Sequence, residues 1–286
     1  MSYIVDENTK VLVQGITGHQ GSFHAGEMVK FGTKVVAGVS PGKSGTKHNG
    51  IPVFDTVADA MSTGANATMI SVPAPYVKDA AYEAIDAGMK LIYILTEHVP
   101  FHDTLEIFHQ TSVRNIRMLG PNGPGVTRVG VCKIGIMPNN IFRKGDVAVA
   151  SRSGTLTYEI VNAITKSGMG ESTVIGLGGD PVVGMTFIDA LKLFYEDKET
   201  KKIVLVGEIG GNNEEKAASY IMEHGDRNKK VVSYITGRSA PKGKRMGHAG
   251  AIIERGVGTA ESKIKAFNEA GVKVADYPDD VPKLLK

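Results

Sequence analysis

The stretch KVLVQGITGHQGSFHAGEMVKF, residues 10–31, joins a short apolar run to a glycine-rich loop and then to a helical pattern. The apolar run predicts a buried strand over 10–14, and the pattern that follows predicts a helix over 22–31. Glycine-rich loops that open onto a helix bind phosphate through backbone N–H groups and the positive end of the helix dipole. The stretch therefore predicts one unit of a doubly wound α/β domain with a phosphate-binding loop at 14–21.

The same alternation of apolar runs and helical patterns continues along the chain. It predicts parallel sheets covered by helices, in two doubly wound domains of five strands each. We expect a first domain over 1–126, a linker over 127–145 that is less regular than the stretches on either side, and a second domain over 146–286. The expected strands after the first are 34–39, 67–72, 91–95, 117–119, 146–150, 173–176, 202–206, 231–235 and 272–275. The other expected helices are 57–62, 77–87, 104–112, 155–167, 186–194, 214–224 and 259–270.

Composition and charge are those of an ordinary globular protein. The 286 residues are 42% hydrophobic and 22% charged, and their net charge is +3, without the basic blocks that bind nucleic acid. No apolar run approaches the ~18 residues of a membrane span, and the polar start is unlike a secretory signal. The single cysteine, Cys132, excludes an internal disulfide and a cysteine-cluster metal site. We therefore expect a cytoplasmic protein with no nucleic-acid partner, no membrane contact and no metal site of its own.

The end of the second strand distinguishes between ligands. Dinucleotide folds that bind NAD place a carboxylate there, which accepts hydrogen bonds from the ribose hydroxyls. This chain has Ser40-Pro41-Gly42-Lys43 instead, and its first loop has the spacing Gly-x-x-Gly-x-x-Gly. A cation suits a ribose that bears phosphate, so NADP and coenzyme A both remain open. Later strand ends add the apolar Val72-Pro73-Ala74-Pro75, which either lines a ligand slot or only marks a turn, and the polar Thr96-Glu97-His98.

Three features in the second half of the chain are candidates for anion binding or catalysis. Ser153-Gly154-Thr155 begins a helix after a strand and either receives an anion or is an ordinary N-cap. Glu208, in a glycine-rich strand end, either orients an imidazole or is a solvated acid. His248 lies in the loop SAPKGKRMGHAG, 239–250, after Lys242, Lys244 and Arg245. This His either carries a phosphoryl group or belongs to a mobile loop without function, but all three features belong at the carboxyl ends of one sheet.

Taken together, these stretches resemble the α subunits of succinate–CoA ligase over essentially the whole chain. The most specific part of the resemblance is Pro241–Ala251. The family's fold is an N-terminal Rossmann-like CoA-binding domain followed by a flavodoxin-like doubly wound domain, as predicted above. The resemblance implies that His248 is phosphorylated in turnover with Glu208 as its partner. It further implies a phosphoryl site at Ser153, Gly154 and Thr155, an organic-acid contact at Tyr158, and CoA contacts at Thr17, Gly18, His19, Gln20, Lys43, Val72, Pro73, Thr96, Glu97, His98, Asn122 and Ile136.

The resemblance also implies a partner, a β subunit with an ATP-grasp nucleotide site. This chain has no Gly-x-x-x-x-Gly-Lys-Ser/Thr loop and no clustered carboxylates for Mg²⁺, so ATP or GTP with Mg²⁺ is expected on that partner. The implied reaction belongs to the tricarboxylic acid cycle. A nucleoside triphosphate phosphorylates His248, the phosphoryl group passes to succinate, and the CoA thiol then displaces phosphate. The assembly is either αβ or α₂β₂.

Two residues depart from the usual family pattern. Gly123 stands where Cys is usual near the expected CoA thiol, and His19 stands where Ser is common. Two other functions remain open at this stage. One is a ligase for malate or another small acid. The residues Thr155–Tyr158 modestly favour succinate over such an acid as the substrate. The other is a non-catalytic protein that senses CoA or a nucleotide, which would not need the loop around His248.

Overall fold

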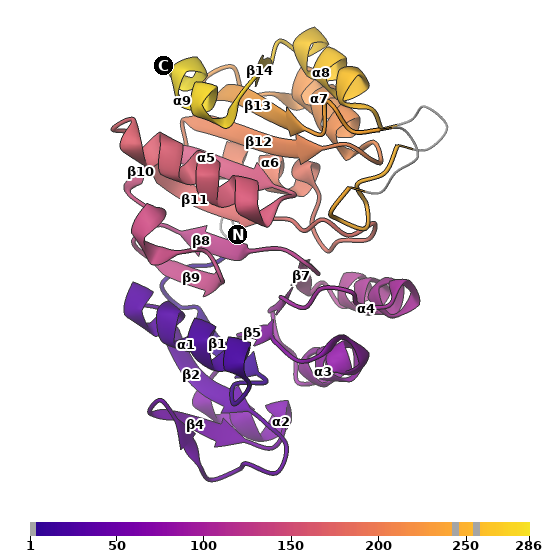
Figure 1. The fold of residues 1–286 in the computed structure, drawn as a ribbon. Helices are drawn as coiled ribbons and strands as arrows, with labels where there is room; N and C mark the ends of the chain where they lie inside the picture. Colours follow the sequence, from indigo (N-terminus) through magenta and orange to yellow (C-terminus); the bar gives the residue numbers. More distant parts are fainter. Residues whose placement is uncertain (1–3, 242–245, 254–257) are drawn as a thin grey trace. The chain divides into compact units, whose positions relative to one another are not determined.

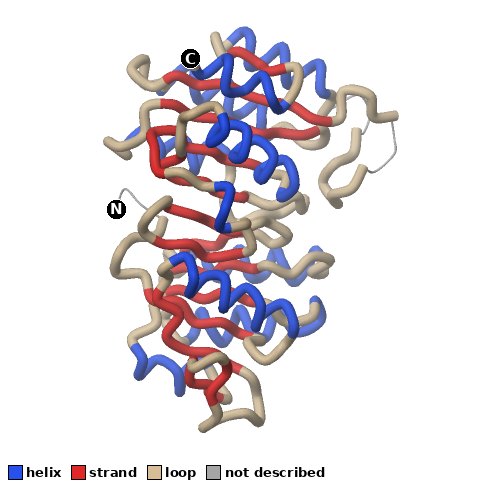
Figure 2. The backbone as a smooth tube through the Cα atoms, turned by 60° about the vertical axis from the view of Figure 1, so that its left-hand side comes forward, coloured by secondary structure: helices blue, strands red, loops and turns tan. Residues whose placement is uncertain are grey.

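The computed structural model describes residues 4–241, 246–253 and 258–286, which form two compact units (Figure 1). The N-terminal unit comprises Ile4–Asn139 and Val182–Gly184, and the C-terminal unit comprises Asn140–Pro181 and Met185–Lys286. In each unit a layer of strands is flanked by helices (Figure 2). None of the helices in the described ranges combines the length and the apolarity that a membrane span needs.

The N-terminal unit is built around a mainly parallel sheet in the order β3-β4-β2-β1-β5-β6-β7, in which only β3 runs antiparallel to its neighbour. Without that edge strand the order is the Rossmann order, and the predicted Rossmann-like fold is confirmed. Its strands are β1 Lys10–Gln14, β2 Lys34–Val39, β3 Lys47–His48, β4 Ile51–Phe54, β5 Ala67–Ile70, β6 Leu91–Ile94, β7 Arg117–Leu119, β8 Gly125–Arg128 and β9 Cys132–Gly135. Its helices are α1 His19–Phe31, α2 Val57–Ala60, η1 Met61–Thr63, η2 Ala74–Tyr76, α3 Val77–Asp86, α4 Phe101–Val113 and η3 Asn139–Ile141, the last of which reaches the unit boundary.

The core of this unit forms where the sequence predicted apolar strands and helix faces. Buried side chains of β1, β5 and β6 pack with one face each of α2, α3 and α4. Gly32 ends α1 in the left-handed conformation, with φ 102°, as expected of a helix C-cap. Helix α1 begins at His19, three residues earlier than predicted, so His19 and Gln20 belong to its first turn.

Two predictions for this half were wrong. The first sheet has two more strands than the five expected, because β4 is only four residues long and contains Pro52, which marks it as a turn in the sequence. The expected linker, 127–145, is also more regular than predicted, since it contains most of the antiparallel hairpin β8–β9. Gly125 and Gly135 face each other across that hairpin, and a Cβ on either would lie within 3 Å of the opposite backbone. Glycine at these two positions therefore allows the two strands to approach closely.

The C-terminal unit has five parallel strands in the order β14-β13-β12-β10-β11. Numbered within the unit this is the flavodoxin-like order, which confirms the predicted fold of the second half and places the topological switch between β10 and β12. Helices α6, α7 and α8 contact one another in one layer, and α5 contacts α9 in another (Figure 1). The strands are β10 Lys144–Ser151, β11 Glu171–Gly176, β12 Lys202–Glu208, β13 Lys230–Thr236 and β14 Lys273–Ala275. The helices are α5 Gly154–Lys166, α6 Phe187–Glu196, α7 Asn213–His224, α8 Ala260–Glu269, η4 Pro278–Asp280 and α9 Val281–Leu285.

Candidate active site

The candidate site of the C-terminal unit lies at the carboxyl ends of β10 and β12, where ligands bind in doubly wound sheets. Glu208 is the last residue of β12, and its side chain is buried with 5% exposure. His248 lies in the loop after β13, and its Nδ1 is 2.8 Å from Oε2 of Glu208. The structure thus brings together the two residues that the sequence predicted as a pair, although they are 40 positions apart.

The imidazole of His248 fits closely against a glycine turn that follows β11. A Cβ built on Gly179 would lie 2.2 Å from Cγ of His248, so only glycine leaves room for the ring. The N–H of Gly250 donates to the carbonyl of Gly179 at 3.1 Å, which fastens the His loop to the same turn. The turn at Gly179 therefore holds the His248 loop through a backbone hydrogen bond and the imidazole through direct packing.

The charge state of His248 follows from its neighbours. The hydrogen bond to Glu208 raises the pKa of His248, burial lowers it, and the charges of Asp180 and Arg152 act in opposite directions, Asp180 raising and Arg152 lowering it. The net direction is upward. Because an ionised carboxylate only accepts hydrogen bonds, Nδ1 carries the proton, and Nε2 is the nitrogen with a lone pair in the neutral ring.

A buried network of charges, which was not predicted from the sequence, contacts Oε1 of Glu208, the carboxylate oxygen that does not bind His248. Nη2 of Arg152 is 3.3 Å from Oε1 of Glu208, and Nη1 is 3.1 Å from Oε1 of Glu214. Lys263 of α8 approaches Oε2 of Glu214 at 2.5 Å. Arg152 follows a strand end directly and precedes Ser153, which was the one indication of its role in the sequence. Glu214 and Lys263 lie on helices, where nothing in the sequence marked them as buried.

The start of α5 has the features predicted for an anion site. Ser153 is the N-cap, and its Oγ accepts a hydrogen bond from the N–H of Leu156 at 3.4 Å. A Cβ on Gly154 would meet nothing within 4 Å, so space beside the first turn is open. Thr155 is exposed, and burial raises the pKa of Tyr158 to about 12, so that its hydroxyl remains a hydrogen-bond donor. The cations Lys242, Lys244 and Arg245, which the sequence analysis placed near His248, lie outside the described residues.

In the N-terminal unit the glycine loop after β1 opens onto α1. Gly15 has a φ of 84°, and a Cβ there would lie 2.5 Å from the carbonyl oxygen of Ser71, so the loop requires glycine. Gly18 is the N-cap of α1 and provides no side-chain cap, while Thr17, His19 and Gln20 are exposed. The N-terminus of α1 therefore presents backbone N–H groups and no acidic first-turn side chain to a ligand.

Lys43 follows the carboxyl end of β2, as predicted. Its side chain is exposed, and its backbone N–H donates to Oδ1 of Asp55 at 3.0 Å. The hydroxyls of Thr17 and Ser40 are 2.8 Å apart, which joins the glycine loop to the same strand end. The cation and the phosphate-binding loop thus belong to adjacent strand ends of one sheet.

The other candidate CoA contacts follow the neighbouring strands β5, β6 and β7 or, in the case of Ile136, strand β9 of the hairpin. Oγ1 of Thr96, after β6, donates to the carbonyl of Val72, after β5, at 2.6 Å. Asn122 follows β7 with a φ of 56°. Ile136 follows β9 and donates its N–H to the carbonyl of Pro124. The remaining three candidates, Pro73, Glu97 and His98, are exposed.

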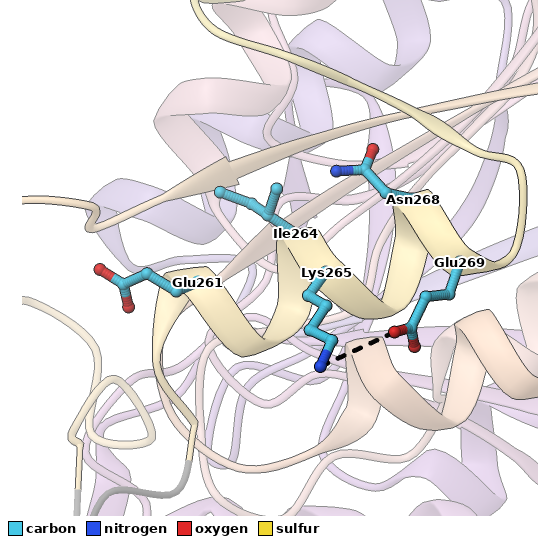
Figure 3. A pocket seen from close by; sticks show the side chains of 5 residues that line it. All are labelled: Glu261, Ile264, Lys265, Asn268 and Glu269. Carbon is cyan, nitrogen blue, oxygen red and sulfur yellow. Dashed lines mark ion pairs between the residues drawn. The ribbon is translucent and has the colours of Figure 1, made fainter.

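A surface hollow of about 530 Å³ lies elsewhere, on the outer face of α8 (Figure 3). Five side chains of that single helix line it, among them Lys265 and Glu269, which form an ion pair at 3.8 Å. None of the candidate residues lines this hollow, and it carries no part of the site.

Comparison with known proteins assigns both units. Residues 6–98 match the family model described as a CoA binding domain, and residues 150–273 match the one described as CoA-ligase. The chain is 54% identical to succinate–CoA ligase (ADP-forming) subunit alpha 2 of Archaeoglobus fulgidus, over all of its own length and 99% of the relative's. It is 52% identical to succinate–CoA ligase (ADP-forming) subunit alpha of Staphylococcus epidermidis, over all of its length and 94% of the relative's.

Solved structures share the fold. An ATP citrate lyase from Methanothrix soehngenii, in complex with citrate and coenzyme A, superimposes with a TM-score of 0.89 at 24% identity, over 99% of this chain and 50% of that chain. A dinucleotide-forming acetyl-coenzyme A synthetase from Ca. Korarchaeum cryptofilum gives a TM-score of 0.79 at 19% identity, over 98% of this chain and 61% of that one. The full-length identity to the curated relatives shows that the chain belongs to the family of ADP-forming succinate–CoA ligase α subunits and is therefore one subunit of an acid–thiol ligase.

Proposed function

We propose that this chain carries the phosphoryl group of a succinate–CoA ligase on Nε2 of His248. The observation that supports this most directly is the 2.8 Å contact between Nδ1 of His248 and the buried carboxylate of Glu208. That contact occupies one ring nitrogen and fixes the tautomer, so the other nitrogen is left as the nucleophile.

The side chains supply the following chemistry. Nε2 of the neutral imidazole attacks the γ-phosphorus of the nucleotide; a P–N bond forms, and the P–O bond to the leaving nucleoside diphosphate breaks. The ring becomes positively charged while it keeps the Nδ1 proton, and Glu208 stabilises that charge. When an oxygen of succinate attacks phosphorus, the P–N bond breaks and His248 returns to the neutral form. Ser153, Gly154 and Thr155 would hold the phosphoryl oxygens at the start of α5, and Tyr158 would contact the acid.

The N-terminal unit would bind coenzyme A. Its exposed helix start suits the diphosphate, and Lys43 suits the 3′-phosphate of the ribose. The thiol of CoA would then displace phosphate from the succinyl phosphate. The residues that we propose as contacts are those predicted from the sequence, from Thr17 in the glycine loop to Ile136 after β9.

The partner would be a β subunit with an ATP-grasp site that holds ATP and Mg²⁺, in an αβ or α₂β₂ assembly. ADP formation is proposed because the relatives' names specify it. A cytoplasmic location is proposed from the single cysteine, Cys132, whose side chain is buried.

The test is phosphoryl labelling of the chain purified together with its partner. With γ-³²P-labelled ATP, this chain should take up label in an acid-labile, base-stable bond, and succinate with CoA should discharge it. The same experiment with γ-³²P-labelled GTP in place of ATP shows which of the two nucleotides donates the phosphoryl group. A complex that forms succinyl-CoA while this chain never takes up label would contradict the proposal.

The role of Lys43 is open to a separate test. Lys43→Ala should lower the affinity for CoA roughly tenfold, the effect of losing one charge-assisted contact to phosphate. It should change the affinity for 3′-dephospho-CoA little. Titration calorimetry with both ligands measures the difference. Lys47→Ala, at an exposed lysine of β3, is the matched control. Equal losses for the two ligands would remove the proposed contact to the 3′-phosphate.

A further inference from the structure

We propose that Arg152 is a positioning residue that holds the Glu208 carboxylate, and through it His248, in the geometry required for phosphoryl transfer; this inference rests on the proposed function of His248. The guanidinium group has three neighbours at once. Nη1 donates to the carbonyl of Gly210 at 3.2 Å and to Oε1 of Glu214 at 3.1 Å, and Nη2 is 3.3 Å from Oε1 of Glu208.

The carboxylate of Glu208 depends on this arrangement. Its Oε2 contacts Nδ1 of His248, while its buried Oε1 has no hydrogen-bond partner among the residues that the structure describes. The positive charge 3.3 Å away on Arg152 is what offsets the negative charge on that oxygen. Since burial of an uncompensated charge is costly, the guanidinium favours this one orientation, in which Oε2 is directed at the imidazole.

Arg152 is itself held rigidly from the opposite side. Glu214 is fully buried, and Lys263, which is also fully buried, contacts it and the carbonyl of Gly211. Lys263 further donates to Oε2 of Glu215 at 3.0 Å. The chain of charges therefore runs from α8 through α7 to the end of β12, and a shift of Arg152 would break its contact with Glu214 of α7.

Arg152 also touches the His loop. A Cβ on Gly250 would lie 3.1 Å from Nη2 of Arg152, so the loop packs directly on the guanidinium. The next residue in the sequence is Ser153, the N-cap of α5. One side chain thus connects the carboxylate, the nucleophile's loop and the proposed phosphoryl site.

This position gives Arg152 an electrostatic effect on the imidazole. Among the described residues, the other charges that act on His248 are those of Glu208 and Asp180, both of which raise its pKa, whereas Arg152 lowers it. Because Arg152 holds Glu208, loss of the guanidinium should weaken the hydrogen bond from His248 to Glu208, which is the largest of the effects that raise the pKa of His248, so this pKa should fall. A residue that only stabilised the fold would not produce that shift. A rise in the pKa would show that Arg152 acts through its charge alone and would overturn the inference.

The experiment is an NMR titration of the full chain with ¹³C-labelled histidine, in which His248→Asn identifies the His248 signal. In Arg152→Met the pKa of His248 should fall by about one unit, because the carboxylate of Glu208 no longer holds the imidazole in its charged form. The acid limb of the pH profile of labelling should move to lower pH with it, and kcat should fall up to about tenfold because the imidazole is no longer held in one tautomer, with KM for CoA unchanged. Arg227→Met, at an exposed arginine before β13, is the control and should move neither.

The variant Arg152→Lys tests the same inference if Arg152→Met does not fold. A single ammonium keeps the charge but loses the planar fork, so we expect a folded protein with a lowered kcat and a smaller pKa shift. A folded Arg152→Met, or Arg152→Lys in its place, with the wild-type pKa and labelling rate would overturn the inference. The titration needs no phosphorylation, so it can support or refute Arg152 even if His248 takes up no label and the proposed function fails.

Discussion

Replacement of His248 by asparagine is expected to reduce phosphoryl labelling of the chain by at least about a thousandfold, to background. Asparagine can still donate a hydrogen bond to Glu208, so the buried carboxylate keeps a partner, but the amide nitrogen has no nucleophilic lone pair. The measurement is retention of ³²P after base treatment, with the modified residue located by mass spectrometry.

The matched control is His224→Asn, which changes an exposed histidine at the end of α7 in the same unit. It should label at the wild-type rate. Both variants should bind CoA with unchanged affinity, because the proposed CoA residues all belong to the N-terminal unit. Full labelling of the His248→Asn complex would show that another residue of this chain accepts the phosphoryl group.

Most of the fold was predictable from the sequence because each buried parallel strand leaves a continuous apolar run. The five strands of the C-terminal unit and its four long helices were predicted to within a few residues. The strands that were missed are β3, which has two residues, and β4, β8 and β9, which have four residues each. At that length, proline or glycine in the strand is indistinguishable from a turn, and tertiary contacts decide the outcome.

The residues of the site were predictable only where a titratable side chain stands in a glycine-rich segment after a strand. His248 among glycines and Glu208 in a glycine-rich turn met that condition. Arg152 and Glu214 did not, because the sequence does not reveal that two opposite charges 62 positions apart are buried against each other. The role of Gly179 was not predictable either, because its contact with the imidazole depends on the packing of two loops.

That contact leads to the second large effect. Gly179→Ala is expected to lower the rate of labelling at least about a hundredfold, because the new methyl group would lie 2.2 Å from Cγ and 2.4 Å from Nδ1 of His248. The φ of Gly179 is not in the left-handed region, so alanine is compatible with the backbone and the effect is steric. The ring must move away, and the contact between Nδ1 and Glu208 is lost.

The control for the methyl group itself is Gly26→Ala in α1, where a Cβ meets nothing within 4 Å. That variant should label normally and gain up to about 1 kcal/mol of stability, as a glycine-to-alanine change in a helix does. Gly179→Ala should instead lose about 1–3 kcal/mol of unfolding free energy to overpacking, seen as a lower Tm. If Gly179→Ala labels within twofold of the wild-type rate, the close fit of the imidazole against this turn does not matter for catalysis, and the loop around His248 must adopt a different position when it accepts the phosphoryl group.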